Sequence, residues 1–184
     1  RDATFPALGA GQHLVANNIF ESTVPYGGAA VRAAVGATQV HITHNTFVNF
    51  NASAVHLSGS SDPTHYPTAQ AVVAGNLFDM TAVDAAPVPR TAIDISAAQV
   101  IVADNQILVR GECDRTVTAL RLLEPAIDIT VHDNLIRNCG QGLACGRASS
   151  QVAAVIDPQT FTLGRRFLPL EHRHSQEGDS SGRP

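Results

Sequence analysis

A tripeptide that recurs five times, asparagine followed by any residue and then phenylalanine or isoleucine, constrains this 184-residue chain more than any other feature. Successive asparagines are 27, 31, 29 and 29 residues apart, and an alternating apolar run precedes each of them. A unit of nearly constant length predicts a stack in which each repeat forms one layer. The five copies are Asn18-Ile19-Phe20, Asn45-Thr46-Phe47, Asn76-Leu77-Phe78, Asn105-Gln106-Ile107 and Asn134-Leu135-Ile136.

A second repeat, with the order small, apolar, variable, apolar, is interleaved with the first. Apolar residues in both repeats follow a period of two, and glycine, proline or asparagine interrupts them about every eight to twelve residues, which predicts short strands and no amphipathic helix. Only 5% of residues are aromatic and none is tryptophan, as expected of thin layers without large core rings. The copies are Ala30-Val31-Arg32-Ala33, Ala54-Val55-His56-Leu57, Ala92-Ile93-Asp94-Ile95, Ala119-Leu120-Arg121-Leu122 and the weaker Gly142-Leu143-Ala144-Cys145.

Three short strands in about 29 residues cannot bury their apolar side chains alone, whereas stacking them at about 4.8 Å per layer makes a continuous core. The order Ala-Val-x-Leu … Val-x-Ile-x-x-Asn-x-Phe resembles the right-handed parallel β-helix repeat of the pectate-lyase-like superfamily, over roughly residues 12–160. The resemblance implies an all-β solenoid of about five to six coils. We expect it to occupy residues 1–170, followed by a polar tail at 171–184.

The same resemblance implies three sheets that run the length of the solenoid. The Ala-apolar strands fall in the first sheet, the runs before the asparagines in the second, and the strands with Phe20, Phe47 and Phe78 in the third. The asparagines are expected at the bend between the second and third sheets, because asparagine tolerates the left-handed conformation and its side chains can form a ladder. The three phenylalanines are expected to stack inside the coil.

The variable residues of the first-sheet strands form one predicted outward column: Arg32, His56, Asp94, Arg121 and Ala144. Insertions at residues 58–67, 84–90 and 110–115 leave from the ends of these strands, so they are expected to wall a groove over the first sheet. His65, Tyr66 and Arg90 lie in these insertions and are candidate substrate contacts, together with Arg32.

The column contains the residue types that acid–base chemistry on an acidic sugar needs. His56 is a candidate proton carrier near neutral pH, Asp94 a carboxylate held between two basic neighbours, and Arg121 a partner for a uronate carboxylate. A mixed-charge ladder on a solvated sheet would have the same composition and no chemistry. Both interpretations remain open from the sequence.

No nucleotide-binding, serine-hydrolase or zinc-spaced motif occurs, and neither metal nor cofactor is expected. The paired aspartates of polygalacturonases are missing, and the column has fewer acids than the groove of calcium-dependent pectate lyases. Glycoside hydrolysis would need a second carboxylate, for which Asp62, Asp84 and Glu112 are the candidates. If the protein is an enzyme, a lyase or epimerase fits better. The alternative is a non-catalytic structural or adhesive shaft segment, as in a phage tail.

Charge and cysteine content bear on partners and location. All twelve cations are arginines, they are dispersed, and the net charge is −4, which argues against nucleic acid, while no apolar run is long enough for a membrane span. The expected partner is a polysaccharide, outside the cell or at its surface.

The cysteines leave two states open: Cys113 and Cys139 could form a disulfide in such a location or stay as thiols, whereas Cys145 is expected in the core. Four outward apolar residues, Val72, Ile101, Leu77 and Leu135, predict self-association or contact with a missing flanking domain.

Overall fold

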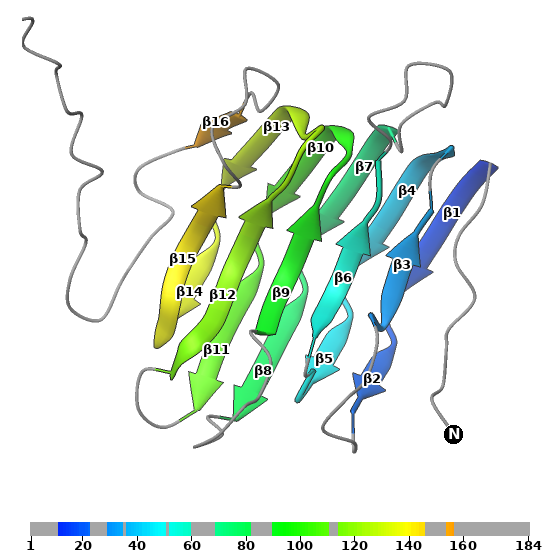
Figure 1. The fold of residues 1–184 in the computed structure, drawn as a ribbon. Helices are drawn as coiled ribbons and strands as arrows, with labels where there is room; N and C mark the ends of the chain where they lie inside the picture. The colour runs from blue at the N-terminus through cyan, green and yellow to red at the C-terminus, as the bar shows by residue number, and fades with distance from the viewer. Residues whose placement is uncertain are drawn as a thin grey trace, which may run out of the picture.

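The computed structural model describes residues 11–22, 29–34, 36–50, 52–59, 69–81, 90–110, 114–145 and 154–156. Within these ranges the chain forms sixteen strands in three parallel sheets (Figure 1) and no helix that could span a membrane. This confirms the predicted all-β parallel solenoid. The tail at 171–184 lies outside the described residues.

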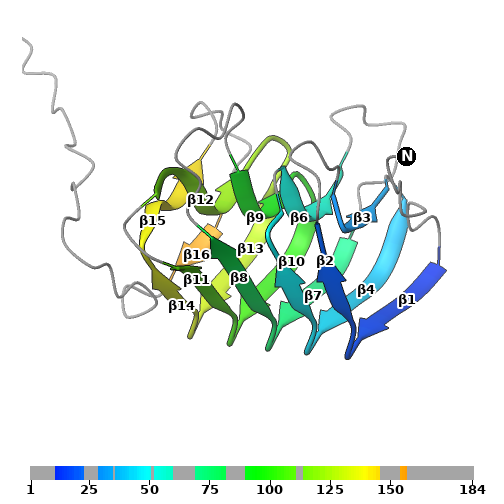
Figure 2. The same ribbon diagram turned by 90° about the horizontal axis from the view of Figure 1, so that it is seen from below.

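Each sheet collects every third strand, because the chain visits the three sheets in turn (Figure 2). The first sheet contains β3 (Val31–Ala33), β6 (Ser53–Leu57), β9 (Arg90–Ile95), β12 (Asp114–Leu122) and β15 (Cys139–Cys145). The second contains β1 (Gly11–Ala16), β4 (Ala37–Thr43), β7 (Ala69–Ala74), β10 (Ala98–Ala103), β13 (Ile127–His132) and β16 (Ala154–Ile156). The third contains β2 (Ile19–Glu21), β5 (Thr46–Val48), β8 (Leu77–Thr81), β11 (Gln106–Arg110) and β14 (Leu135–Arg137).

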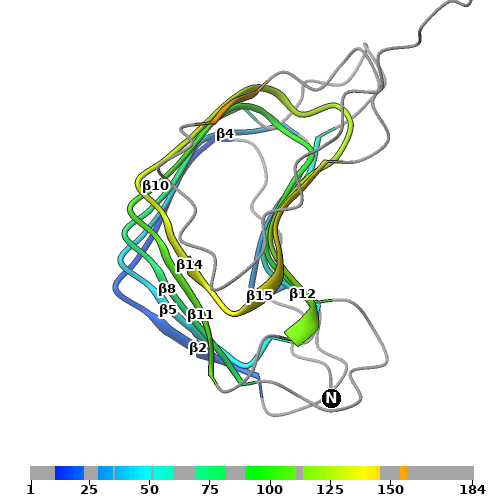
Figure 3. The same ribbon diagram turned by 90° about the vertical axis from the view of Figure 1, so that its left-hand side faces the viewer.

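Seen along the axis, the coils superpose around a common interior (Figure 3), which equivalent apolar residues of successive coils fill. The ring of Phe47 stacks on Phe20 at a centroid distance of 5.1 Å and on Phe78 at 4.8 Å, with interplanar angles of 8° and 12°. Ile107 and Ile136 continue this column in register. The predicted internal stack is therefore confirmed.

The repeated asparagines form the predicted hydrogen-bonded ladder beside this stack. Asn76 donates from its backbone nitrogen and from Nδ2 to Oδ1 of Asn105, at 3.1 and 2.9 Å, and Asn105 does the same to Asn134. From Asn45 onward, each Nδ2 also donates to a backbone carbonyl of the preceding coil; for Asn105 this is the carbonyl of Val73, at 2.8 Å. The ladder satisfies polar groups that would otherwise be buried without partners at the bend.

The sequence predicted the left-handed conformation at the ladder asparagine, and this prediction is wrong: the residue before each asparagine adopts it. Asn17, His44, Gly75, Asp104 and Asp133 have φ between 54° and 65°. The residue before each asparagine turns the chain, which frees the asparagine side chain to point inward and bond along the axis. Four of these five residues tolerate the left-handed conformation through a short polar side chain or a ring, and glycine tolerates it without strain.

The last coil corrects one prediction about the cysteines. Cys145 ends β15, the outermost strand of the first sheet, and it is exposed rather than part of the core. Among the described residues no strand pairs with β15 on its far side, so the position that would be inward in an interior coil is left uncovered. Cys113 lies outside the described residues, and the disulfide with Cys139 stays a prediction.

Candidate functional site

The first sheet aligns the predicted column residue by residue. Arg32 pairs with His56, His56 with Asp94, Asp94 with Arg121, and Arg121 with Ala144, each as directly opposed partners of parallel strands. Because parallel register repeats at about 4.8 Å, these side chains leave the sheet one above another. The alignment that the sequence predicted is therefore present in the fold.

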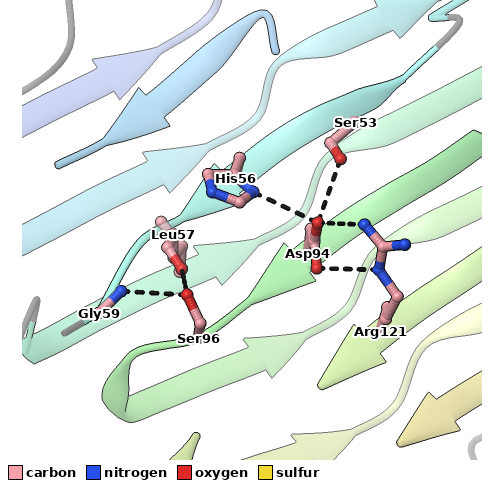
Figure 4. Close-up of polar contacts among 7 residues, drawn as sticks. All are labelled: Ser53, His56, Leu57, Gly59, Asp94, Ser96 and Arg121. Atoms are coloured by element: carbon pink, nitrogen blue, oxygen red, sulfur yellow. Dashed lines mark hydrogen bonds and ion pairs between the residues drawn. The ribbon is translucent and has the colours of Figure 1, made fainter. Parts of the chain in front are cut away.

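Asp94 is the centre of a polar cluster within this column (Figure 4). Arg121 binds it in a two-point contact, with Nε 3.1 Å from Oδ1 and Nη2 2.5 Å from Oδ2. His56 Nδ1 lies 3.3 Å from Oδ2, and the hydroxyl of Ser53 lies 3.4 Å from the same oxygen. Three side chains from two neighbouring strands thus converge on one carboxylate.

Burial distinguishes Asp94 from its neighbours and corrects the expectation that it stands in the open groove. Its side chain is 3% exposed, compared with 27% for His56 and 37% for Arg121. Burial alone would raise the pKa of Asp94, but the hydrogen bonds and positive charges of His56 and Arg121 outweigh it and hold that pKa below its ordinary value. The hydrogen bond to Asp94 raises the pKa of Arg121, against a smaller opposing effect of burial.

The ionised state of Asp94 determines how His56 is oriented. A carboxylate has no proton to donate, so the Nδ1 of His56 is the donor in their hydrogen bond. In the neutral imidazole Nε2 is then the atom with a free lone pair, and it can accept a proton. Asp94 is therefore a positioning residue, and the groups that can touch a substrate are His56 and Arg121.

Arg32, at the edge of the column, is exposed and makes no ion pair with another described residue. With Asp94 ionised, the two arginines and the carboxylate of the column give a net charge of 2 − 1 = +1, to which a protonated His56 would add. The first sheet is thus locally positive in a protein whose net charge is −4.

Ser53 is a member of the cluster that the sequence did not reveal. It lies three residues before His56 on β6, and strict alternation puts residues three apart on opposite faces of a strand. The hydroxyl nevertheless reaches Asp94 from the first residue of the strand. A sequence search could have found Ser53 only by considering every polar residue of the strands next to Asp94, including those that strict alternation puts on the inner face.

A second contact fixes the end of β6 beside the cluster (Figure 4). The Ser96 hydroxyl donates to the carbonyl of Leu57 at 3.2 Å and accepts from the backbone nitrogen of Gly59 at 3.1 Å. A Cβ atom at Gly59 would collide with the carbonyl oxygen of Ser96. This close approach ties successive coils together at the edge of the candidate site.

Of the residues predicted to wall the groove, the structure describes Arg90. Arg90 is the first residue of β9 and is 1% exposed, so it is covered rather than presented to a substrate, contrary to the expectation of a loop contact. The other wall candidates, His65, Tyr66, Asp62, Asp84 and Glu112, lie outside the described residues. No group of three or more metal-binding side chains occurs in the described part of the chain.

No family model, curated protein or solved structure matches this chain. The strand pairing alone therefore identifies the parallel solenoid, and any function must be inferred from the site.

Proposed function

We propose that the first sheet binds an acidic, uronic-acid-containing polysaccharide and that His56 and Arg121 act on it, in a protein of the pectate-lyase-like type. The observation that carries the proposal is the cluster in which a buried, ionised Asp94 orients two partly exposed basic side chains. A carboxylate buried at this depth has lost much of its hydration, and its partners compensate for that cost. The result is a preorganised pair of basic groups on a flat strand surface.

The chemistry of the pair fits β-elimination or epimerisation better than hydrolysis. Arg121 can hold the carboxylate of a uronate and stabilise negative charge that develops next to it, while His56 Nε2 takes the proton from C5. In an elimination the C5 electron pair forms the C4–C5 double bond, the C4–O bond breaks, and the departing oxygen takes a proton from water. Hydrolysis would need a second carboxylate, and Asp94 is the one carboxylate of the described column.

The test separates binding from turnover with three variants. Arg121→Gln should weaken binding of polygalacturonate or alginate roughly 10- to 150-fold, the range for loss of a charge-assisted hydrogen bond. His56→Gln should keep the affinity and abolish the rise in ultraviolet absorbance that an unsaturated product gives. In an epimerase the absorbance stays flat for the wild type too, and exchange of the C5 proton with deuterated solvent is the readout.

Arg110→Gln is the matched control. Arg110 pairs with Asp79 on the third sheet, with Nε 2.7 Å from Oδ1, so the substitution removes an equal charge from an equivalent ion pair away from the column. If Arg110→Gln weakens binding as much as Arg121→Gln, the interaction is unspecific attraction and the proposal fails. It also fails if no uronic-acid polymer binds the wild type.

The structural alternative is favoured by one observation. Leu14 on β1 and Ile19 on β2 are 73% and 78% exposed, and both strands are the outermost described strands of their sheets. A shaft segment would cover such residues with a further coil or a second copy of the chain. Association in sedimentation velocity that Leu14→Ser and Ile19→Ser abolish, with no polysaccharide affinity, would establish this alternative.

A further inference from the structure

A groove crosses the outer side of the second sheet, away from the His56–Asp94–Arg121 cluster. Its main part is a shallow, open hollow of about 620 Å³, in which the side chains of Gln39, Gln70, Gln99 and Asp128 lie beside His41 and the apolar side chains of Val72 and Ile101. A second hollow of about 460 Å³ shares Gln39 and His41 with the first and continues the groove onto β1. The groove therefore runs along the solenoid axis across strands β1 to β13.

Its polar side is a column of equivalent residues. On β7 and β10 the residues on either side of Gln70 pair with the residues on either side of Gln99, so the two glutamines lie opposite each other. By the same register, Asp128 on β13 lies opposite Gln99, and Gln39 on β4 lies opposite Gln70. All four are exposed and have φ between 51° and 58°. One polar side chain thus projects from each coil, at about 4.8 Å intervals.

The backbone does not account for the glutamines. At the other left-handed bend of each coil the chain has asparagine, aspartate, histidine or glycine, the types that tolerate this conformation. Glutamine has no such advantage, yet it occupies three of the four bends in this column. The repeated element at these positions is therefore the longer amide side chain rather than a residue suited to the turn.

The glutamines also do not form a ladder of their own. In the described part of the chain no hydrogen bond joins the side chains of Gln39, Gln70 and Gln99, in contrast to the buried asparagines. Each exposed amide offers two donor hydrogens and an acceptor oxygen. The column presents these groups to solvent at a regular spacing.

We propose that this groove binds a neutral polysaccharide chain that lies parallel to the solenoid axis. An amide can bond to adjacent hydroxyls of a sugar as both donor and acceptor, and Val72 and Ile101 supply an apolar floor for the C–H face of a ring. The charged and titratable groups that line the groove are the carboxylate of Asp128 and the imidazoles of His41 and His13, with no arginine or lysine, so it lacks the permanent cations that an acidic polymer would need. One amide per coil suits a ligand whose own unit repeats at a similar length.

The test is native affinity electrophoresis of the whole chain in gels that contain hydroxyethyl cellulose, galactomannan or dextran. At least one of these neutral polymers should retard the wild type. The double variant Gln70→Gly/Gln99→Gly removes two amides and suits the left-handed backbone, so it should fold and bind roughly 5- to 150-fold more weakly. Gln106→Ala, an exposed glutamine on the third sheet, is the control and should bind as the wild type does.

Three outcomes overturn the proposal: no neutral polymer retards the protein, the double variant binds as well as the wild type, or Gln106→Ala weakens binding equally. Sedimentation of the wild type as a dimer that the double variant abolishes would assign the groove to a second copy of the chain instead. The groove lies on the second sheet, away from the first-sheet site, so the two proposals are tested separately. Arg121→Gln should leave the retardation by neutral polymers unchanged.

Discussion

Replacing Asn105 by alanine should cost more stability than replacing any exposed asparagine of this chain. Asn105 lies in the middle of the ladder and is 0% exposed. Its Nδ2 donates to Val73 O and to Asn134 Oδ1, and its Oδ1 accepts from the backbone nitrogen and from the Nδ2 of Asn76. The substitution removes all four bonds at once.

The magnitude follows from these contacts. Four hydrogen bonds at about 0.5–1.5 kcal/mol each give about 2–6 kcal/mol, and the upper half of the range applies because buried donors of Asn76 lose their acceptor in a place that water does not reach. Native domains are stable by about 5–15 kcal/mol, so about a quarter or more of the total stability is at stake. At a urea m-value of about 2 kcal/mol/M, a loss of about 4–6 kcal/mol lowers the denaturation midpoint by about 2–3 M.

Asn18→Ala is the matched comparison, because Asn18 is the exposed first member of the same ladder. Its Nδ2 donates to Ala16 O and to Asn45 Oδ1, where water can replace it. We expect a loss below about 1 kcal/mol. Asn105→Asp should be as damaging as the alanine variant, since a carboxylate keeps the acceptor but cannot donate to Val73 or Asn134.

Urea unfolding of the three variants, followed by circular dichroism, measures these differences. An Asn105→Ala midpoint no lower than that of Asn18→Ala would refute the argument that the buried ladder holds the coils together. Tolerance of Asn105→Asp would show that only the acceptor side of the ladder matters.

Three further predictions concern single side chains. The pKa of Asp94 is lower in the folded than in the unfolded protein, so its ionised form stabilises the fold above about pH 4, the unfolded value, and this stabilisation is lost as the pH falls through the folded pKa. Asp94→Asn should therefore be less stable than the wild type near neutral pH and equally stable in acid. Denaturation at a series of pH values measures this difference, and a gap that does not change with pH would contradict the argument. Phe47→Ala should cost about 3–5 kcal/mol by chemical denaturation. Phe20→Ala should cost clearly less, because Phe47 is fully buried between the rings of Phe20 and Phe78, whereas Phe20 is only half-buried; equal losses would deny the stack a role. Gly59→Ala should lower stability by about 1–3 kcal/mol because its Cβ collides with the Ser96 backbone, and an unchanged thermal midpoint would show that this edge yields freely.

The sequence by itself determined the architecture and the register. A repeat of about 29 residues with a period of two can bury its apolar side chains only by stacking, and equal spacing then puts equivalent residues into columns. For that reason the asparagine ladder, the phenylalanine stack and the alignment of His56, Asp94 and Arg121 could all be predicted before any coordinates were known.

Only the tertiary structure decided how deep each residue of those columns lies and which irregular neighbours join them. Asp94 was expected in the open, but two longer basic side chains fold over it. Ser53 joins the cluster against the alternation, Arg90 is buried instead of exposed, and the left-handed residue precedes the ladder asparagine. Periodicity fixes which residues are stacked, whereas burial depends on the sizes and charges of the side chains that the stack brings together, and no single repeat contains that information.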